Sequence, residues 1–94
     1  MTTVHTVLDI STAHIHRNDM VKLSGDETPA IAYSYEEGVF VFAGDPQDDY
    51  RDFKDYGFSL EFVHILLWAR QLGCKYVQFD CDGTEYEQLP KFEW

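Results

Sequence analysis

SLEFVHILLWARQLG, residues 59–73, has the length and periodicity of an α-helix that packs on a core. Its apolar residues recur every three or four positions, which places them on one helical face. Ser59 suits the N-cap, and Gly73 suits the left-handed conformation that follows a last helical turn. We predict that the stripe facing the core consists of Phe62, Ile65, Leu66, Ala69 and Leu72.

The same helix carries a second apolar stripe, so it is not cleanly amphipathic. One interpretation is that the helix lies deep in a small core. The other is that the second stripe contacts another chain, because a small monomer seldom leaves so much apolar surface in water. On the second interpretation we predict a homodimer whose interface contains Leu60, Val63 and Leu67.

Four β-rich segments surround this helix in the sequence. They are predicted at residues 4–10, 30–35, 39–43 and 75–80. The second and third are joined by Glu36-Glu37-Gly38, a connection typical of a hairpin. The element order β-β-β-α-β predicts an α+β fold, with a four-stranded, mainly antiparallel sheet and one main helix packed on one face. The helical connection before the last strand allows that strand to pair in parallel with the third. We expect a single domain over residues 1–94.

The predicted hairpin has bulky residues on both faces. Tyr33 and Tyr35 share one side of the first strand, and Phe40 and Phe42 alternate with valines on the second. The second face of the sheet is therefore not simply polar. Either the termini fold across it or another molecule does.

The chain is strongly acidic. It has 17 Asp and Glu against 7 Lys and Arg, a net charge of −10. This charge disfavours direct binding to nucleic acid or to anionic membranes, and it favours basic protein partners. No apolar run approaches the roughly 18 residues that span a membrane. The N-terminus lacks a signal sequence and the two cysteines are too far apart along a strand to pair, so we expect a cytoplasmic protein with reduced thiols.

The acids are densest in residues 44–57, GDPQDDYRDFKDYG, where aspartates recur at helical spacing. Two more acids lie at the predicted hairpin tip. Asp80, Asp82, Glu85 and Glu87 extend this negative surface if the fold brings them close. The residues that we predict to bind a partner are Asp45, Asp48, Asp49, Asp52, Asp55, Glu36 and Glu37.

Three patterns invite a chemical interpretation. Asp80-Cys81-Asp82-Gly83-Thr84 after a strand resembles the first motif of haloacid-dehalogenase-type phosphatases, but the downstream lysine and acidic metal ligands of those enzymes have no room in the ten residues that follow. The same segment lacks the spaced ligands of a calcium loop. His14-x-His16 is a weak zinc signal even with His5 and His64. We predict a strand followed by an Asp-Gly turn, hydrogen-bonded loop histidines, and no catalytic residues, metal or cofactor.

Three stretches carry a resemblance to a known family. They are LDISTAHI (residues 8–15), LGCKYVQFDCDG (72–83) and LPKFEW (89–94). The chain resembles a family of small acidic bacterial proteins of unknown function that are carried on plasmids, phages and other mobile elements. The resemblance implies no activity and no catalytic residues, but it implies a setting in which small acidic proteins often antagonise host DNA-directed defence.

Three functions follow. The first is a non-enzymatic inhibitor of a host DNA-directed defence system, an anti-CRISPR or anti-restriction protein that mimics DNA phosphates and binds a basic nucleic-acid-handling protein. The second is an accessory or regulatory protein-interaction module without mimicry, which uses the aromatic face or the C-terminal tail. The third is a small enzyme or metal protein. Charge favours the first, and we expect a protein that is not an enzyme.

Overall fold

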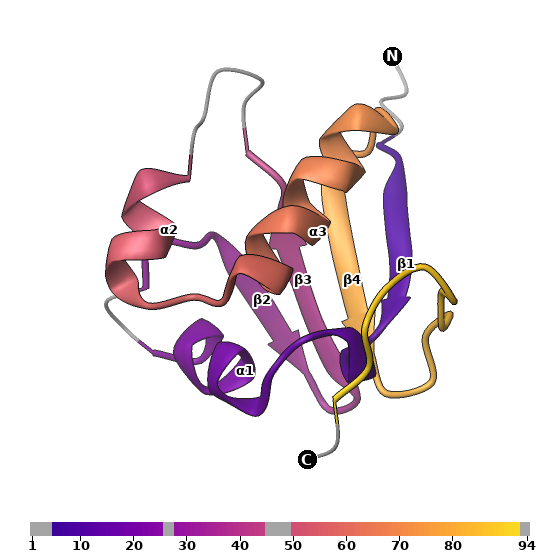
Figure 1. The fold of residues 1–94 in the computed structure, drawn as a ribbon, viewed down its shortest axis with the longest axis horizontal. Helices are drawn as coiled ribbons and strands as arrows, with labels where there is room; N and C mark the ends of the chain where they lie inside the picture. Colours follow the sequence, from indigo (N-terminus) through magenta and orange to yellow (C-terminus); the bar gives the residue numbers. More distant parts are fainter. Residues whose placement is uncertain (1–4, 26–27, 45–49, 93–94) are drawn as a thin grey trace.

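The computed structural model describes residues 5–25, 28–44 and 50–92, and Figure 1 shows their arrangement. A sheet forms one layer, and helices form a second layer on one of its faces. In chain order the elements are β1 (Val7–Ser11), a 3-10 turn η1 (Thr12–His14), α1 (Arg17–Leu23), β2 (Ala32–Tyr35), β3 (Gly38–Phe42), α2 (Arg51–Tyr56), α3 (Leu60–Gln71) and β4 (Tyr76–Asp80).

The fold class is the predicted one, an α+β fold with a four-stranded and mostly antiparallel sheet. The strands lie in the order β1-β4-β3-β2. The last strand of the chain is therefore inserted between the first and the third. The predicted hairpin is confirmed, because β2 and β3 pair antiparallel with Tyr35 opposite Gly38. The prediction of a single main helix was incomplete, because α1 and α2 join α3 on the same side of the sheet (Figure 1).

The parallel pair is not the one that the sequence suggested. β4 runs antiparallel to β3 and parallel to β1. The reason is that two helices, α2 and then α3, connect β3 to β4, so the chain returns to the end of the sheet where β3 finished. The Ala43 N–H after β3 accordingly donates to the carbonyl of Lys75 just before β4, at 2.8 Å.

The core lies between α3 and the inner face of the sheet. Val77 and Phe79 of β4 are fully buried, and Tyr76 and Gln78 alternate with them on the other face. The aromatic side chains form a series across the layers: the ring centroids of Phe58 and Phe62 are 4.6 Å apart, and those of Phe62 and Phe79 are 5.7 Å apart. Aromatic pairs of this kind contribute roughly 0.5–1.5 kcal/mol beyond the area that they bury.

The predicted stripe of α3 is confirmed at four of its five residues. Ser59 is the N-cap, with its hydroxyl oxygen accepting from the Phe62 N–H at 3.1 Å, and Gly73 has a φ of 83°. Leu72 was placed wrongly, since it is the C-cap and its side chain is 53 % exposed. The helix ends at Gln71 and the chain then turns into β4, so the helical periodicity no longer decides which side chains face the core. The buried residues are Phe62, Ile65, Leu66 and Ala69.

The segment after β4 packs back on the molecule through its apolar residues. The Phe92 N–H donates to the carbonyl of Ala13 at 2.7 Å. Trp68 of α3 meets Tyr86 edge-on, with ring centroids 5.1 Å apart, and Leu89 packs against the core. Trp94 lies outside the described residues. No helix in the described ranges has the length and apolarity to cross a membrane.

Two leucines of the predicted stripe, Leu66 in α3 and Leu72 at its C-cap, give a direct test of the packing. Leu66→Ala should lower the free energy of unfolding by about 2–5 kcal/mol, because Leu66 is fully buried and truncation leaves a cavity. Leu72→Ala is the matched control and should change it by less than about 1 kcal/mol. Urea denaturation measures both, and equal losses would contradict this placement of α3.

Candidate functional site

The predicted partner-binding acids separate into two groups. Asp52 and Asp55 lie exposed on α2, while Asp45, Asp48 and Asp49 fall outside the described residues. Glu36 and Glu37 are exposed in the turn between β2 and β3. Figure 1 shows α2 and this turn well apart, so the structure does not gather the described members into one patch.

The turn instead joins acids that follow β4. Gly38 lies opposite Asp80 in the β3–β4 register, and the Cys81 N–H donates to the carbonyl of Glu37 at 3.0 Å. We call the resulting set of four carboxylates, Glu36, Glu37, Asp80 and Asp82, the acidic end of the sheet. Of the four acids that were expected to extend the negative surface, Asp80 and Asp82 therefore join the hairpin turn but not the acids of α2. Glu85 forms an ion pair with Lys91 at 3.1 Å, and Glu87 is exposed.

The close approach of the turn depends on glycine. A Cβ at Gly38 would lie 1.8 Å from the carbonyl oxygen of Phe79, which leaves no room for any side chain. On the other side of the strand end, a Cβ at Gly83 would lie 2.4 Å from the carbonyl oxygen of Ile10. Two glycines therefore let β1, β3 and the residues after β4 meet at the acidic end.

Hydrogen bonds hold Asp80 ionised at this end. The Tyr35 hydroxyl donates to Oδ2 of Asp80 at 2.6 Å, and the Asp82 N–H donates to Oδ1 at 2.8 Å. These two bonds, the one from Tyr35 first, lower the pKa of Asp80. Burial raises the pKa of Tyr35, and its bond to Asp80 raises it further, so the phenol keeps its proton and remains the donor.

Loss of solvation and the negative charges of the acidic end raise the pKa of a neighbouring thiol, Cys81. Loss of solvation is the largest cause, and the charges of Asp82, Asp80 and Glu37 raise the pKa further in that order. In the described part of the chain, neither the His16–Glu61 nor the Lys91–Glu85 ion pair includes a residue of the acidic end. The Cys81 thiol is therefore a poor nucleophile at neutral pH.

The Asp80-x-Asp82-Gly83 segment forms a turn, as predicted. The Gly83 N–H donates to the carbonyl of Asp80 at 2.9 Å. Ligand atoms of Asp80, Cys81 and Asp82 come within 4.8 Å of one another, the one such group of three in the described ranges. Calcium and zinc take four or more ligands from more than one direction, and both oxygens of Asp80 already accept hydrogen bonds.

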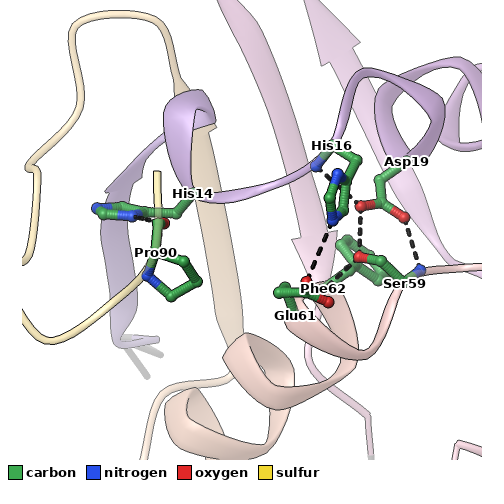
Figure 2. Close-up of polar contacts among 7 residues, drawn as sticks. All are labelled: His14, His16, Asp19, Ser59, Glu61, Phe62 and Pro90. Atoms are coloured by element: carbon green, nitrogen blue, oxygen red, sulfur yellow. Dashed lines mark hydrogen bonds and ion pairs between the residues drawn. The ribbon is translucent and has the colours of Figure 1, made fainter. Parts of the chain in front are cut away.

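The two histidines that suggested zinc have structural partners (Figure 2). His14 is fully buried: the Tyr86 N–H donates to its Nε2 at 2.9 Å, and its Nδ1 lies 2.8 Å from the carbonyl oxygen of Pro90. A carbonyl only accepts, so Nδ1 carries the proton and the ring is neutral. His16 bonds to Glu61 at 3.2 Å and stacks on Phe92, with ring centroids 3.9 Å apart. Both histidines thus fasten other segments to η1 and α1.

Sequence reasoning missed the most connected polar residue, Asp19. Its carboxylate is buried and accepts from the His16 N–H at 3.1 Å, the Ser59 N–H at 2.8 Å and the Ser59 hydroxyl at 2.6 Å. Figure 2 shows the carboxylate between the start of α1 and the start of α3. The stretch around it, residues 17–29, is mostly polar and has no helix-length apolar pattern. The signal available was Asp19 three residues after His16, where a helix-capping side chain stands.

Ser59, His16 and Asp19 are the residue types of a catalytic triad, but their roles differ from one. The Ser59 hydroxyl donates to Asp19 and accepts from the Phe62 N–H, so its hydrogen points to a carboxylate and not to an imidazole. His16 bonds to Glu61 instead. The cluster is a capping network that locks two helix starts together.

The predicted dimer stripe is not a continuous exposed surface. Leu60 is 60 % exposed, Leu67 is half-buried, and Val63 is only 1 % exposed. Val63 was assigned wrongly to an exposed stripe, because α2 and the C-terminal segment cover sides of α3 that a lone helix on a sheet would leave open. A homodimer stays a prediction.

A second surface is the face of the sheet opposite the helices. Its residues surround a shallow depression of about 340 Å³. Among the described residues it is left uncovered, since Tyr33 is 65 % and Val7 is 39 % exposed. We call this surface, lined by His5, Val7, Tyr33, Phe40 and Tyr76, the open sheet face. The bulky residues on both faces of the hairpin indicated such a surface in the sequence. The sequence did not indicate that Val7 and Tyr76 belong to it, because that depends on the strand order.

With this geometry established, residues 7–94 match one known family, described as the C-terminal domain of DUF5983, a family of unknown function. The chain belongs to the DUF5983 C-terminal domain family. Searches of curated proteins and of solved structures gave no match. Membership confirms a family of unknown function. The bacterial origin and mobile-element setting stay predictions, and the proposals for this DUF5983 domain rest on its own surfaces.

Asp19→Asn tests the capping network. The amide cannot accept from all three donors, so the free energy of unfolding should fall by about 1.5–3 kcal/mol. Asp52→Asn, an exposed position on α2, is the control and should change it by less than about 0.5 kcal/mol. If thermal or urea unfolding shows no difference between the two variants, Asp19 does not join α1 to α3.

Glu61 gives a pH-dependent prediction. The hydrogen bond from His16 lowers the pKa of Glu61 below its usual 4.5. A lowered folded-state pKa stabilises the fold above the unfolded-state value, and this stabilisation is lost as pH falls through the folded-state pKa. Wild type should therefore melt above Glu61→Gln at pH 6, with a gap that closes below about pH 4. In a His16→Asn background the gap should shrink at pH 6, and an undiminished gap would contradict the pairing.

Proposed function

We propose that this domain is a non-enzymatic binding module for a basic surface of a nucleic-acid-handling protein. The observation that carries the proposal is the acidic end, where Glu36 and Glu37 of one turn join Asp80 and Asp82 of another. A charge of −10 adds long-range attraction to the same kind of partner. At physiological salt this attraction acts over a Debye length of about 8–10 Å.

The more specific form of the proposal is that the domain inhibits a host DNA-directed defence system, as an anti-CRISPR or anti-restriction protein. Carboxylates would occupy positions where the host protein binds phosphates. Hydrogen bonds keep Asp80 ionised, and the bond from the Asp82 N–H to the Asp80 carboxylate holds the two acids close together. Fixed anions are what a phosphate-binding groove recognises. The exposed Asp52 and Asp55 on α2 supply a second acidic region for a partner that wraps the domain.

A second candidate is an accessory or regulatory protein-interaction module without mimicry. The open sheet face favours it, because exposed aromatic side chains on a rigid sheet are typical of protein interfaces. The two candidates make different predictions about competition. A DNA mimic is displaced by duplex DNA, whereas an accessory module binds its partner and DNA together.

The test compares two variants that each remove three charges. Glu36→Gln, Glu37→Gln and Asp82→Asn neutralise the acidic end but keep Asp80, which holds Tyr35. Asp48→Asn, Asp49→Asn and Asp52→Asn remove three charges from the acidic stretch of sequence at residues 44–57. Each variant is used to capture proteins from a nuclease-treated bacterial lysate, and association rates with the captured protein are measured against salt and against added duplex DNA.

We expect the acidic-end variant to slow association more than its matched control, with little change in stability, because exposed charges contribute little to folding. Wild-type binding should weaken as salt rises, and duplex DNA should displace the partner if mimicry holds. Binding that ignores salt and both variants would refute the proposal. Binding that responds to salt but not to DNA would favour the accessory module.

A further inference from the structure

We infer that the open sheet face, together with the acidic end, docks an arginine-bearing segment of a protein partner. The inference rests on the proposed function, since it names the part of the basic partner that is bound and where it lies. The open sheet face combines an apolar depression with exposed aromatic rings. Tyr33 is 65 % exposed on this face. The ring centroid of Tyr76 lies 5.9 Å from that of His5 and 5.8 Å from that of Phe42.

The open sheet face and the acidic end are continuous through Tyr35. The ring centroid of Tyr35 lies 5.4 Å from that of Phe40, and its hydroxyl donates to Asp80. Gln78, which lies between Asp9 and Phe40 in the sheet register, donates to the same hydroxyl at 3.0 Å. A partner segment that crosses the aromatic rings therefore reaches fixed carboxylates within the length of the strands.

This combination of groups selects the chemistry of the occupant. Exposed aromatics on a sheet also form stacking platforms for single-stranded nucleic acid, but those platforms line positively charged grooves, whereas here the rings lead to the carboxylates of the acidic end and Lys75 is the cation beside Tyr76. A second copy of the chain would bring another −10 charge and another acidic end to the same place, and like charges oppose such contact. Aromatic rings beside carboxylates suit a cation.

Arginine fits better than lysine. Its planar guanidinium stacks on an aromatic ring and still donates paired hydrogen bonds to a carboxylate, whereas an ammonium is a compact, strongly hydrated charge. The chain already shows a cation near these rings, because Nζ of Lys75 lies 5.8 Å from the ring centroid of Tyr76. Apolar side chains that alternate with arginine would enter the depression beside Val7 and Phe40.

The test uses two synthetic peptides with blocked ends, in which valine alternates with arginine or with citrulline, its neutral counterpart of the same shape. Affinities are measured by isothermal titration for wild type, Tyr33→Leu, Tyr33→Phe and the double variant Glu37→Gln, Asp82→Asn. Tyr33 is on an edge strand and exposed, so both substitutions should leave the fold intact, which circular dichroism checks.

We expect the arginine peptide to bind more tightly than the citrulline peptide. Tyr33→Leu should weaken it by roughly two- to fivefold, and Tyr33→Phe, which keeps the ring, should not. Unchanged affinity in Tyr33→Leu with a loss in the acid double variant would overturn this inference but leave the basic-partner proposal standing. Equal binding of the two peptides would overturn both. No binding, or tighter binding of a single-stranded oligonucleotide, would overturn the inference.

Discussion

The insertion of β4 between β1 and β3 is the constraint on which the rest of the structure depends. Both edges of β4 are hydrogen-bonded, one parallel and one antiparallel, and its inward residues Val77 and Phe79 are fully buried. Its outward residue Tyr76 completes the open sheet face, and its last residue, Asp80, lies beside the turn between β2 and β3. One strand therefore supplies the centre of the core, the centre of the open sheet face and part of the acidic end.

The helical layer is fixed to this sheet by buried polar contacts at its starts. Asp19 binds the backbone and side chain of Ser59, and Ser59 in turn caps α3. His14 ties the C-terminal segment to η1 with one ring nitrogen accepting and the other donating. A buried carboxylate and a buried imidazole whose hydrogen bonds are all made favour this one packing, because an alternative packing would leave them unpaired. All helices thus stay on one side and leave the other face of the sheet open.

Local patterns in the sequence predicted most of the helices and strands. The strand order and the buried polar contacts depend on long-range contacts, which the sequence does not show. The two ends of α3 could be predicted from Ser59 and Gly73, because helix capping depends on residues that are neighbours in the sequence. The strand order depends on contacts such as Gly38 with the Phe79 carbonyl and Gly83 with the Ile10 carbonyl, which join distant segments. Asp19 was unpredictable as a core residue because a charged side chain is buried only where three donors converge. Of the candidate site, Glu36 and Glu37 were predicted directly, and their meeting with Asp80 follows only from the sheet.

We propose that the two surfaces act together: the aromatic rings of the open sheet face and the carboxylates of the acidic end receive a cationic protein segment. The most direct measurement is NMR of the domain, with side-chain methyls and aromatic rings assigned, titrated with the arginine–valine peptide carrying a spin label at one end. We predict that the ring signals of Tyr33, Phe40 and Tyr76 broaden while the methyl signals of Leu60 and Leu72, which are more than half exposed, do not. Broadening centred on α2 or α3, with the sheet rings unaffected, would contradict the account.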